Sequence, residues 1–550
     1  MKKLFLFFPI MLCLGGQQSI AQTPFATMDS VDINNIHATL LVHGDMWNNP
    51  ATGNSNCIFP AGSGENIGYV GSLWMSGYDA GNNLHIAAQT YRQNGNDYWP
   101  GPLDGSDTLT YATAQNWAKI WKVNRTDIQT FQAMSAAGTA TSTNTAAAIW
   151  EWPAKGNVYA KGNAGVSLTI TDDMAPFVDL NGNEIYEPQL GEYPDVKGDQ
   201  ALWCAFSDNG PTHNETNGKA LGVEVHLMAY AYKRGNTYDD MIFYQYTISN
   251  KSANSYSNFR AGIFADMDLG YYRDDFIGCD TNRGLGIIYN GEPNDPIYGT
   301  NIPIAGVLMR AVGAPVGSFM YYNNEVSVLG NPTSDVQYDG YLRSTFRDGT
   351  HATDDFTGAG VPTTAHGSGP ATNYVFNGNP ADPTQWSECS SRNTPGDRRF
   401  VISSSDMTLN AGATLQVTSI LITTNLGPAN ACGDAGLTFS QIDSVADSAT
   451  SVYDFGGLPV LAVANTHVRA NNTVIVYPNP AHNQLIIENS NNSLEETYIT
   501  IYNCIGQVMD MPIIKNGQKA VVDVGSLPDG LYNVLYRQGD VQQAVKFVKE

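Results

Sequence analysis

Alternation of apolar and polar side chains is the clearest pattern in this chain, and it is strictest between Gly222 and Tyr232. A period of two residues places successive side chains on opposite faces, which predicts a β-strand with one face in the core. The core face would carry Val223, Val225, Leu227, Ala229 and Ala231, and the other face Glu224, His226, Met228, Tyr230 and Tyr232. Apolar runs at 241–248 and 256–265 predict two more strands, which would complete an antiparallel meander with the first.

Shorter strand-like runs separated by Gly, Asn and Pro turns fill most of the remaining chain. Two of them, 399–402 and 414–422, are expected in the same sandwich as the meander. Residues 437–455 differ, because their apolar side chains recur at helical spacing and predict a helix packed on a sheet. The apolar face of that helix would hold Ile442, Val445, Ala446, Ala449 and Val452.

These elements predict an all-β protein with one late helix. We expect two β-sandwich-like domains, an N-terminal one at 22–170 and a second at 171–455 that contains acidic loops and the helix. The pattern fades between 456 and 472, where we place a linker. A last small domain occupies 473–550.

Residues 473–550 contain about six or seven short β-rich runs, the pattern of a small β-sandwich. Two motifs mark this segment: Tyr477-Pro478-Asn479-Pro480 near its start, and Leu527-Pro528 followed by Gly530 and Tyr532. With an IYNxxGQ strand-turn between them and a basic end, the segment resembles the type A C-terminal sorting domain of the type IX secretion system of Bacteroidetes. That resemblance implies an immunoglobulin-like β-sandwich.

The same resemblance implies a route for the protein. Such cargo contacts the type IX secretion machinery and a sorting peptidase, and it is released or attached to surface glycolipid. The start of the chain agrees, because Lys2 and Lys3 precede a short apolar run at 4–14 and the small residues of Ser19-Ile20-Ala21. This pattern predicts a signal peptide at 1–21. No apolar run is long enough for a membrane-spanning helix, which needs about 18 residues.

An aromatic stretch at 72–105 resembles a recurring region of large, uncharacterised secreted Bacteroidetes proteins. Its Trp74, Tyr91, Tyr98 and Trp99 have two interpretations. Exposed aromatic side chains stack on sugar rings, whereas buried ones fill a core.

The charge balance excludes one class of function. The chain carries 28 Lys and Arg against 52 Asp and Glu, a formal net charge of −24. An acidic surface repels phosphates, so we expect no nucleic-acid partner. Acidic loops can instead hold divalent cations.

The cysteines do not fix a disulfide pattern. Six of the seven remain once Cys13 leaves with the signal peptide, and they allow fifteen pairings. Cys504 belongs to the last domain, so the cargo keeps an odd number and at least one cargo cysteine is free or pairs elsewhere. No CxxC spacing occurs, which argues against a cysteine zinc site.

A first candidate calcium site is the turn at 179–187. Asp179, Asn181, Asn183 and Glu187 present side-chain oxygens at alternate positions, and they resemble the ligands of DxDxDG-type calcium loops. The turn departs from the pattern of those loops in three ways. Its glycine comes too early, two of its ligands are neutral amides, and the twelfth loop position does not hold a bidentate Glu. The alternative is a loop of Asx turns with solvated charge.

A second candidate follows the third predicted strand. Asp266, Asp268, Asp274 and Asp275 lie in one loop, where they repel one another unless solvated, paired with Arg273 or bridged by a cation. Paired carboxylates also serve as acid and base in glycoside hydrolysis. A secreted hydrolase using Asp266, Asp268 and Asp275, with His226 nearby, is therefore the alternative function.

We expect a non-enzymatic surface protein: an adhesin, a glycan-binding module or an extracellular structural component. The chain has no GxSxG elbow, phosphate-binding loop or HExxH helix. The polar face of the first predicted strand supplies aromatic and hydrogen-bonding groups suited to recognition. These candidate binding residues are Glu224, His226, Tyr230 and Tyr232.

Overall fold

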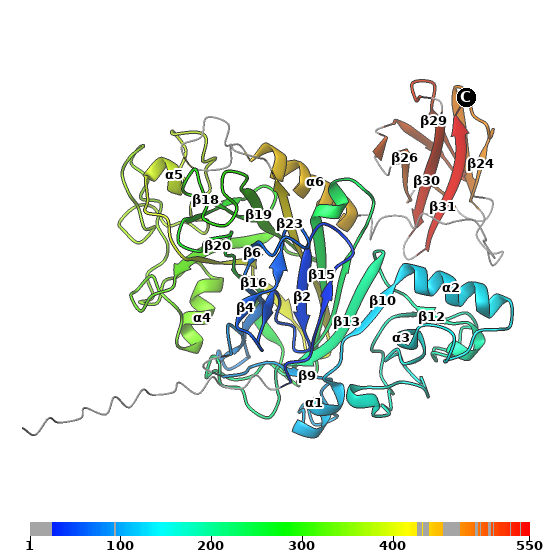
Figure 1. Ribbon diagram of the computed structural model, residues 1–550, viewed down its shortest axis with the longest axis horizontal. Coiled ribbons are helices and arrows are strands. Elements are labelled where there is room, and N and C mark those ends of the chain that lie inside the picture. The colour runs from blue at the N-terminus through cyan, green and yellow to red at the C-terminus, as the bar shows by residue number, and fades with distance from the viewer. Residues whose placement is uncertain are drawn as a thin grey trace, which may run out of the picture. The chain divides into compact units, whose positions relative to one another are not determined.

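The computed structural model describes most of the chain up to residue 454 and most of the last domain. The described residues are 25–92, 95–425, 432, 439–454, 474–489, 493–494, 497–503, 508–509, 511–528, 530–538 and 541–549. The expected signal peptide (1–21) and linker (456–472) lie outside them. The chain divides into two compact units at Ala449–Thr450 (Figure 1).

Two large antiparallel sheets form the first unit, the cargo. One has the order β10 (Trp121–Asn124), β13 (Gln200–Ser207), β14 (Val223–Ala231), β15 (Met241–Asn250), β23 (Thr414–Asn425), β19 (Pro303–Ala311), β18 (Leu285–Asn290) and β17 (Asp275–Asp280), with β9 (Trp99–Pro100) beside β13. The other has the order β20 (Val316–Asn323), β21 (Arg398–Ser404), β16 (Tyr256–Asp266), β7 (Val70–Tyr78) and β8 (Leu84–Ala87), with β22 (Met407–Leu409) beside β16.

Smaller elements complete the cargo. A four-stranded sheet contains β1 (Met28–Val31), β2 (His37–Leu41), β5 (Cys57–Ile58) and β6 (Asn66–Gly68), and short pairs join β3 (Asn48–Asn49) to β4 (Asn54–Ser55) and β11 (Phe177–Val178) to β12 (Tyr193–Pro194). The helices are α1 (Tyr111–Trp117), α2 (Arg125–Ala136), α3 (Ala147–Trp150), α4 (Asp335–Leu342), α5 (Glu388–Ser391) and α6 (Ser440–Asp454), with 3-10 turns at Asn163–Gly165, Pro188–Leu190 and Thr237–Asp240.

The all-β class is confirmed, and one hydrophobic core joins strands of both large sheets. The predicted meander is correct only for its first two strands, because β14 pairs with β15 while β16 crosses to the other sheet. The segment at 251–255 therefore links two layers rather than closing a hairpin. The two later predicted strands, 399–402 and 414–422, correspond to β21 and β23. These two strands also lie in different sheets.

The expected domain boundary at residue 170 is wrong. Strand β7 comes from the N-terminal part of the chain, yet it pairs with β16 along most of its length. Its residues are buried from Val70 to Gly77, so the strand needs neighbours on both sides and on both faces. Strands β9 and β10 likewise pair with β13. Residues on both sides of 170 thus belong to one folded unit.

The aromatic side chains of the 72–105 stretch mainly fill the core. Trp74 is fully buried, stacks on Phe264 at 5.1 Å and donates from Nε1 to the Gln89 carbonyl at 2.8 Å. The Tyr98 hydroxyl lies 2.9 Å from the carbonyl oxygens of both Leu73 and Ala87, which share its single hydrogen. Core packing is therefore the correct interpretation for Trp74 and Tyr98.

Helix α6 confirms the predicted late helix, and the apolar face expected from the sequence is buried. Arg283, in the turn between β17 and β18, pairs with Asp447 at 2.8 Å and Asp443 at 3.5 Å. None of the helices in the described part of the chain combines the length and apolar character needed to span a bilayer.

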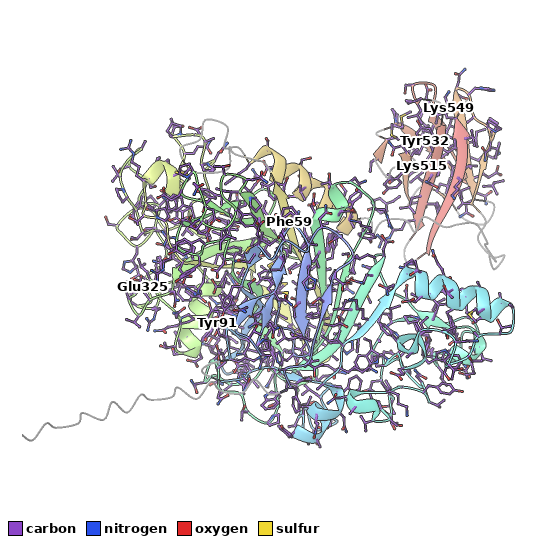
Figure 2. The ribbon with its side chains drawn as sticks, in the orientation of Figure 1. Phe59, Tyr91, Glu325, Lys515, Tyr532 and Lys549 are labelled. Carbon is purple, nitrogen blue, oxygen red and sulfur yellow. A yellow bond between two sulfur atoms is a disulfide. The ribbon has the colours of Figure 1, made fainter. Side chains whose placement is uncertain are left out.

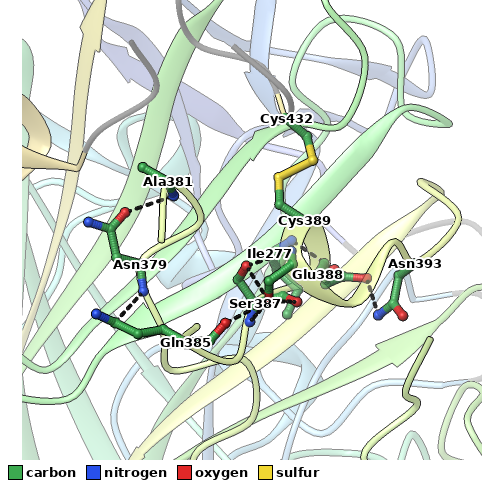
Figure 3. Close-up of a disulfide and its surroundings, with 10 residues drawn as sticks. Ile277, Asn379, Ala381, Gln385, Ser387, Glu388, Cys389, Asn393 and Cys432 are labelled. Carbon is green, nitrogen blue, oxygen red and sulfur yellow. Dashed lines mark hydrogen bonds between the residues drawn. A yellow bond between two sulfur atoms is a disulfide. The ribbon is translucent and has the colours of Figure 1, made fainter. Parts of the chain in front are cut away.

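Within the described residues, a disulfide joins Cys389, in α5, to Cys432 (Figure 3). Cys57, Cys204 and Cys279 are free and buried, whereas Cys504 lies outside the described residues. The neighbouring Glu388 carboxylate pairs with Arg398 at 2.9 Å and accepts from the Ile277 N–H at 3.0 Å. The disulfide thus joins Cys432 to the short helix that holds this buried ion pair.

We predict that Cys432→Ser lowers the free energy of unfolding by about 2–4 kcal/mol, because the bridge spans 43 residues and restricts the unfolded chain. Chemical denaturation of the full chain measures the change. Reductant should lower the stability of the unsubstituted protein to that of the variant and leave the variant unchanged. Equal stability of the two oxidised proteins would contradict the prediction.

Candidate functional site

The C-terminal unit is a β-sandwich whose two sheets share a hydrophobic core. One sheet contains β24 (Val474–Tyr477), β25 (Gln484–Asn489), β29 (Lys519–Asp523) and β28 (Ile513–Asn516). The other contains β27 (Val508–Met509), β26 (Tyr498–Asn503), β30 (Gly530–Gln538) and β31 (Val541–Lys549). Strand β31 follows β30 as a long antiparallel partner and forms the edge of its sheet.

The first motif, Tyr477-Pro478-Asn479-Pro480, makes hydrogen bonds to strand β31. Asn479 donates from Nδ2 to the Lys546 carbonyl at 3.2 Å and accepts from the Val548 N–H at 2.8 Å. Tyr477 donates to the Glu488 carboxylate at 2.5 Å and accepts from Lys519 at 3.1 Å. The motif therefore joins the start of the domain to its last strand.

The second motif supplies core side chains and a turn. Tyr532, marked in Figure 2, is buried, stacks on Phe547 at 5.4 Å and donates to the Pro528 carbonyl at 2.8 Å. Leu527 is buried in the same core. Removing residues from Leu527 onward would remove both β30 and β31.

The turn at 179–187 brings its four predicted ligands together. Glu187 Oε2 accepts from the side-chain amides of Asn181 at 2.9 Å and Asn183 at 2.8 Å. Asp179 accepts from the backbone N–H groups of Gly182 at 2.6 Å and Glu184 at 2.9 Å. These contacts are those of an Asx-turn loop, and calcium binding here stays a prediction.

The buried Glu192 also supports this turn, and sequence reasoning missed it. Its carboxylate accepts from the Leu180 N–H at 3.0 Å and the Glu187 N–H at 2.8 Å.

The polar face of β14 is covered, contrary to expectation. Glu224, Tyr230 and Tyr232 are each only 2% exposed. The Glu224 carboxylate lies 2.9 Å from His226 Nε2 and accepts from the Leu103 N–H at 3.0 Å. Aromatic side chains and the loop at Leu103 shield this face, so an open recognition surface at Glu224, His226, Tyr230 and Tyr232 is wrong.

The second acidic candidate, Asp266, Asp268, Asp274 and Asp275, has a different membership in the structure. Carboxylate oxygens of Asp266 and Asp268 meet one from Asp397, all within 4.8 Å of one another. Asp274 and Asp275 do not join that group of three. Asp275 lies at the start of β17 and accepts from the Leu269 N–H at 3.2 Å.

Antiparallel pairing explains why Asp397 is present. Asp266 is opposite Arg399 in the β16–β21 register, so the residues just before β21 lie beside the end of β16. Arg399 pairs with Asp266 at 3.2 Å and Asp397 at 2.9 Å. The sequence contains no local signal for this meeting, because the two segments are about 130 residues apart.

Burial and mutual repulsion perturb these acids. Burial, opposed by Arg399 and reinforced by Asp397, raises the pKa of Asp266 to about 6. Burial and the neighbouring Asp266 hold the pKa of Asp268 well above its usual range. Burial and Asp268 do the same to the pKa of Asp275. Strongly perturbed acids of this kind mark candidate functional sites.

A pocket of about 410 Å³ adjoins this cluster. That volume falls within the range of small-ligand sites. Aromatic, hydroxyl, amide and guanidinium groups line it: Tyr69, Thr90, Tyr91, Asn324, Asn331, Pro332, Thr333, Tyr338 and Arg399. Tyr91, labelled in Figure 2, links the pocket to the acids because its hydroxyl donates to Asp266 and accepts from Arg399.

A second buried acid, Glu215, contacts two other lining residues, Thr90 and Tyr338. Glu215 Oε1 accepts from the Thr90 hydroxyl and from the Tyr338 hydroxyl at 3.1 Å, while Oε2 has no hydrogen-bond partner. Burial is the main reason that the pKa of Glu215 rises to about 7; Asp97 reinforces the shift, and Arg92 opposes it.

Glu215→Gln is predicted to flatten the pH dependence of stability between about pH 4.5 and 7. The pKa of Glu215 is higher in the folded chain than in the unfolded chain. Its contribution to the free energy of unfolding is therefore full below about pH 4.5 and disappears as the pH rises through 7. The lost stability is about 3 kcal/mol for this shift.

Chemical denaturation of the unsubstituted protein and of Glu215→Gln across this pH range gives the difference in their free energies of unfolding. That comparison separates Glu215 from other acids whose pKa is raised by burial to about 6, including Asp266 and Asp274. Parallel pH profiles would show that Glu215 titrates normally.

Comparison with known proteins gives a defined result for the C-terminal unit. Residues 475–550 match the family model described as the secretion system C-terminal sorting domain. No curated protein sequence matches the chain.

Solved structures show only weak likeness to the chain. A polysaccharide lyase matches 59% of it at 8% identity and TM-score 0.18, and the match covers 34% of the lyase. A family GH92 inverting mannosidase from Bacteroides thetaiotaomicron matches 45% at 11% identity and TM-score 0.18, over 21% of its length. A putative aldose 1-epimerase from Escherichia coli K12 matches 48% at 9% identity and TM-score 0.17, over 78% of its length.

These low scores do not establish a shared fold, and the family match alone carries the identification. The matched segment covers both sorting motifs, and both have structural roles in the sandwich. The chain is therefore a cargo of the type IX secretion system, directed by its C-terminal sorting domain to the cell surface or the extracellular space.

Proposed function

We propose that the exported cargo is a non-enzymatic glycan-binding protein that acts as an adhesin at the cell surface. The observation that carries this proposal is the pocket between Tyr69, Tyr91, Tyr338 and Arg399. Its lining combines aromatic rings with amide and hydroxyl groups. Rings stack on the apolar faces of sugars, and polar groups bond to their hydroxyls.

The charge behind the pocket favours a neutral saccharide. Glu215, Asp266, Asp268 and Asp397 lie beside the lining residues or one contact behind them, whereas Arg399 is already paired with two of these acids. A uronic acid or sulfated sugar would meet net repulsion if these acids were ionised. We therefore expect uncharged hexose units as ligands.

Binding should weaken about fivefold in Tyr69→Ala, because stacking on one ring contributes roughly 1 kcal/mol. The full chain, screened on a glycan array and then titrated with the best ligand, supplies the measurement. Tyr111→Ala is the matched control, since Tyr111 is 55% exposed and lies outside the pocket lining. Equal loss in both variants, or no glycan ligand at all, would contradict the proposal.

A secreted hydrolase remains the second candidate, and a specific observation favours it. Asp266 and Glu215 both adjoin pocket-lining residues, and burial raises their pKa values to about 6 and 7. Raised values suit a general acid near neutral pH. Turnover of a polysaccharide that disappears in Asp266→Asn would replace the adhesin proposal with this one.

The sorting sandwich supplies the contact with the secretion machinery. We propose that a sorting peptidase then releases the cargo or joins it to surface glycolipid. Because β30 and β31 form half of one sheet, their loss would destroy the shape that the machinery recognises.

Deleting residues 527–550 is accordingly predicted to trap the protein in the periplasm. Cell fractionation with an antibody against the cargo locates it. Ile514→Ser is a control of the same domain, because Ile514 is 70% exposed and outside both motifs. Normal surface delivery of the truncated chain would contradict the role of the tail.

A further inference from the structure

Three carboxylates converge where β16 ends and β21 begins. Asp266 is the last residue of β16, Asp268 follows two positions later, and Asp397 precedes β21. One carboxylate oxygen from each lies within 4.8 Å of those from the other two. Arg399 is the cation paired with Asp266 and Asp397, so the four groups carry a formal charge of −2 when all are ionised.

A separate observation concerns the hydrogen bonds of these acids. Asp266 is 1% exposed, and its Oδ1 has no hydrogen-bond partner, although Oδ2 contacts Tyr91 and Arg399. Within the described residues, no donor or cation is found on the Asp268 carboxylate. Leaving a buried charged oxygen without a partner is costly, and metal coordination is one way to avoid that cost.

We propose that Asp266, Asp268 and Asp397 bind a divalent cation with the preferences of calcium. All three ligands are carboxylate oxygens, which hard cations prefer. Oxygens about 2.4 Å from calcium on opposite sides of the ion are about 4.8 Å apart, so the observed convergence fits its coordination sphere. The ion's two positive charges balance the −2 of the cluster.

The cluster is a better candidate than the turn at 179–187. In that turn, Asp179 and Glu187 already accept backbone or side-chain N–H groups, and the loop is exposed. The cluster instead combines a buried unpartnered oxygen with charge that Arg399 only partly neutralises. The cation would stabilise the wall of the pocket through Tyr91 and Arg399, whether or not the pocket takes a saccharide.

Titration of calcium chloride into the full metal-free chain tests the site by calorimetry, with thermal unfolding as a second readout. We expect calcium to bind and to raise the Tm, because a ligand of the native state stabilises it. Asp268→Asn should weaken binding at least tenfold, and Asp179→Asn should leave it unchanged. Asp268→Asn should still fold without calcium, since it removes a repelling charge.

Three results would overturn the assignment. The first is no heat and no Tm shift with calcium, which would leave the acids held by Arg399 and protons. The second is binding that Asp179→Asn abolishes and Asp268→Asn does not. The third is magnesium binding as tightly as calcium, because a calcium-type site discriminates against the smaller ion.

Discussion

The pairing of β16 with β7 on one side and β21 on the other is the constraint on which the cargo depends. The three strands come from residues 70–78, 256–266 and 398–404, so their alignment joins the beginning, middle and end of the unit. Strand β16 reaches this sheet only because the chain crosses between layers after β15. A common hydrophobic core then packs the two large sheets together, and Trp74 of β7 stacks on Phe264 of the adjacent strand β16 within one of them.

That alignment also creates the candidate site. Asp266 is opposite Val70 of β7 and Arg399 of β21. The end of β16 and the beginnings of β7 and β21 therefore lie side by side at one end of the sheet. Tyr69 immediately precedes β7, and Asp397 immediately precedes the Arg398 at which β21 begins. The pocket wall and the acidic cluster are therefore two consequences of a single register. Loops that follow or precede the ends of strands can differ in chemistry while the β-sandwich that holds them keeps its fold.

Electrostatics distinguishes the cluster from ordinary surface acids. Exposed carboxylates lose little by being near one another because water screens them, whereas burial makes each additional negative charge expensive. The Arg399 guanidinium offsets part of this repulsion, and the raised pKa values of Asp266 and Asp268 reflect what remains. Protonation or a bound cation can both remove the remaining charge, and they predict different responses to calcium.

The sequence by itself determined the all-β class, the strands β14 and β15, the buried face of α6 and the sorting domain. Those features follow from local periodicity or from motifs within a short segment. The tertiary structure alone decided that β16 leaves the meander, that Asp397 joins Asp266, and that Glu224 and Tyr230 are covered. Alternation shows which face of a strand is more apolar, but it carries no information about what packs on the other face. Strand partners and ligand sets drawn from distant segments depend on the free energy of the whole fold, which no short window of sequence contains.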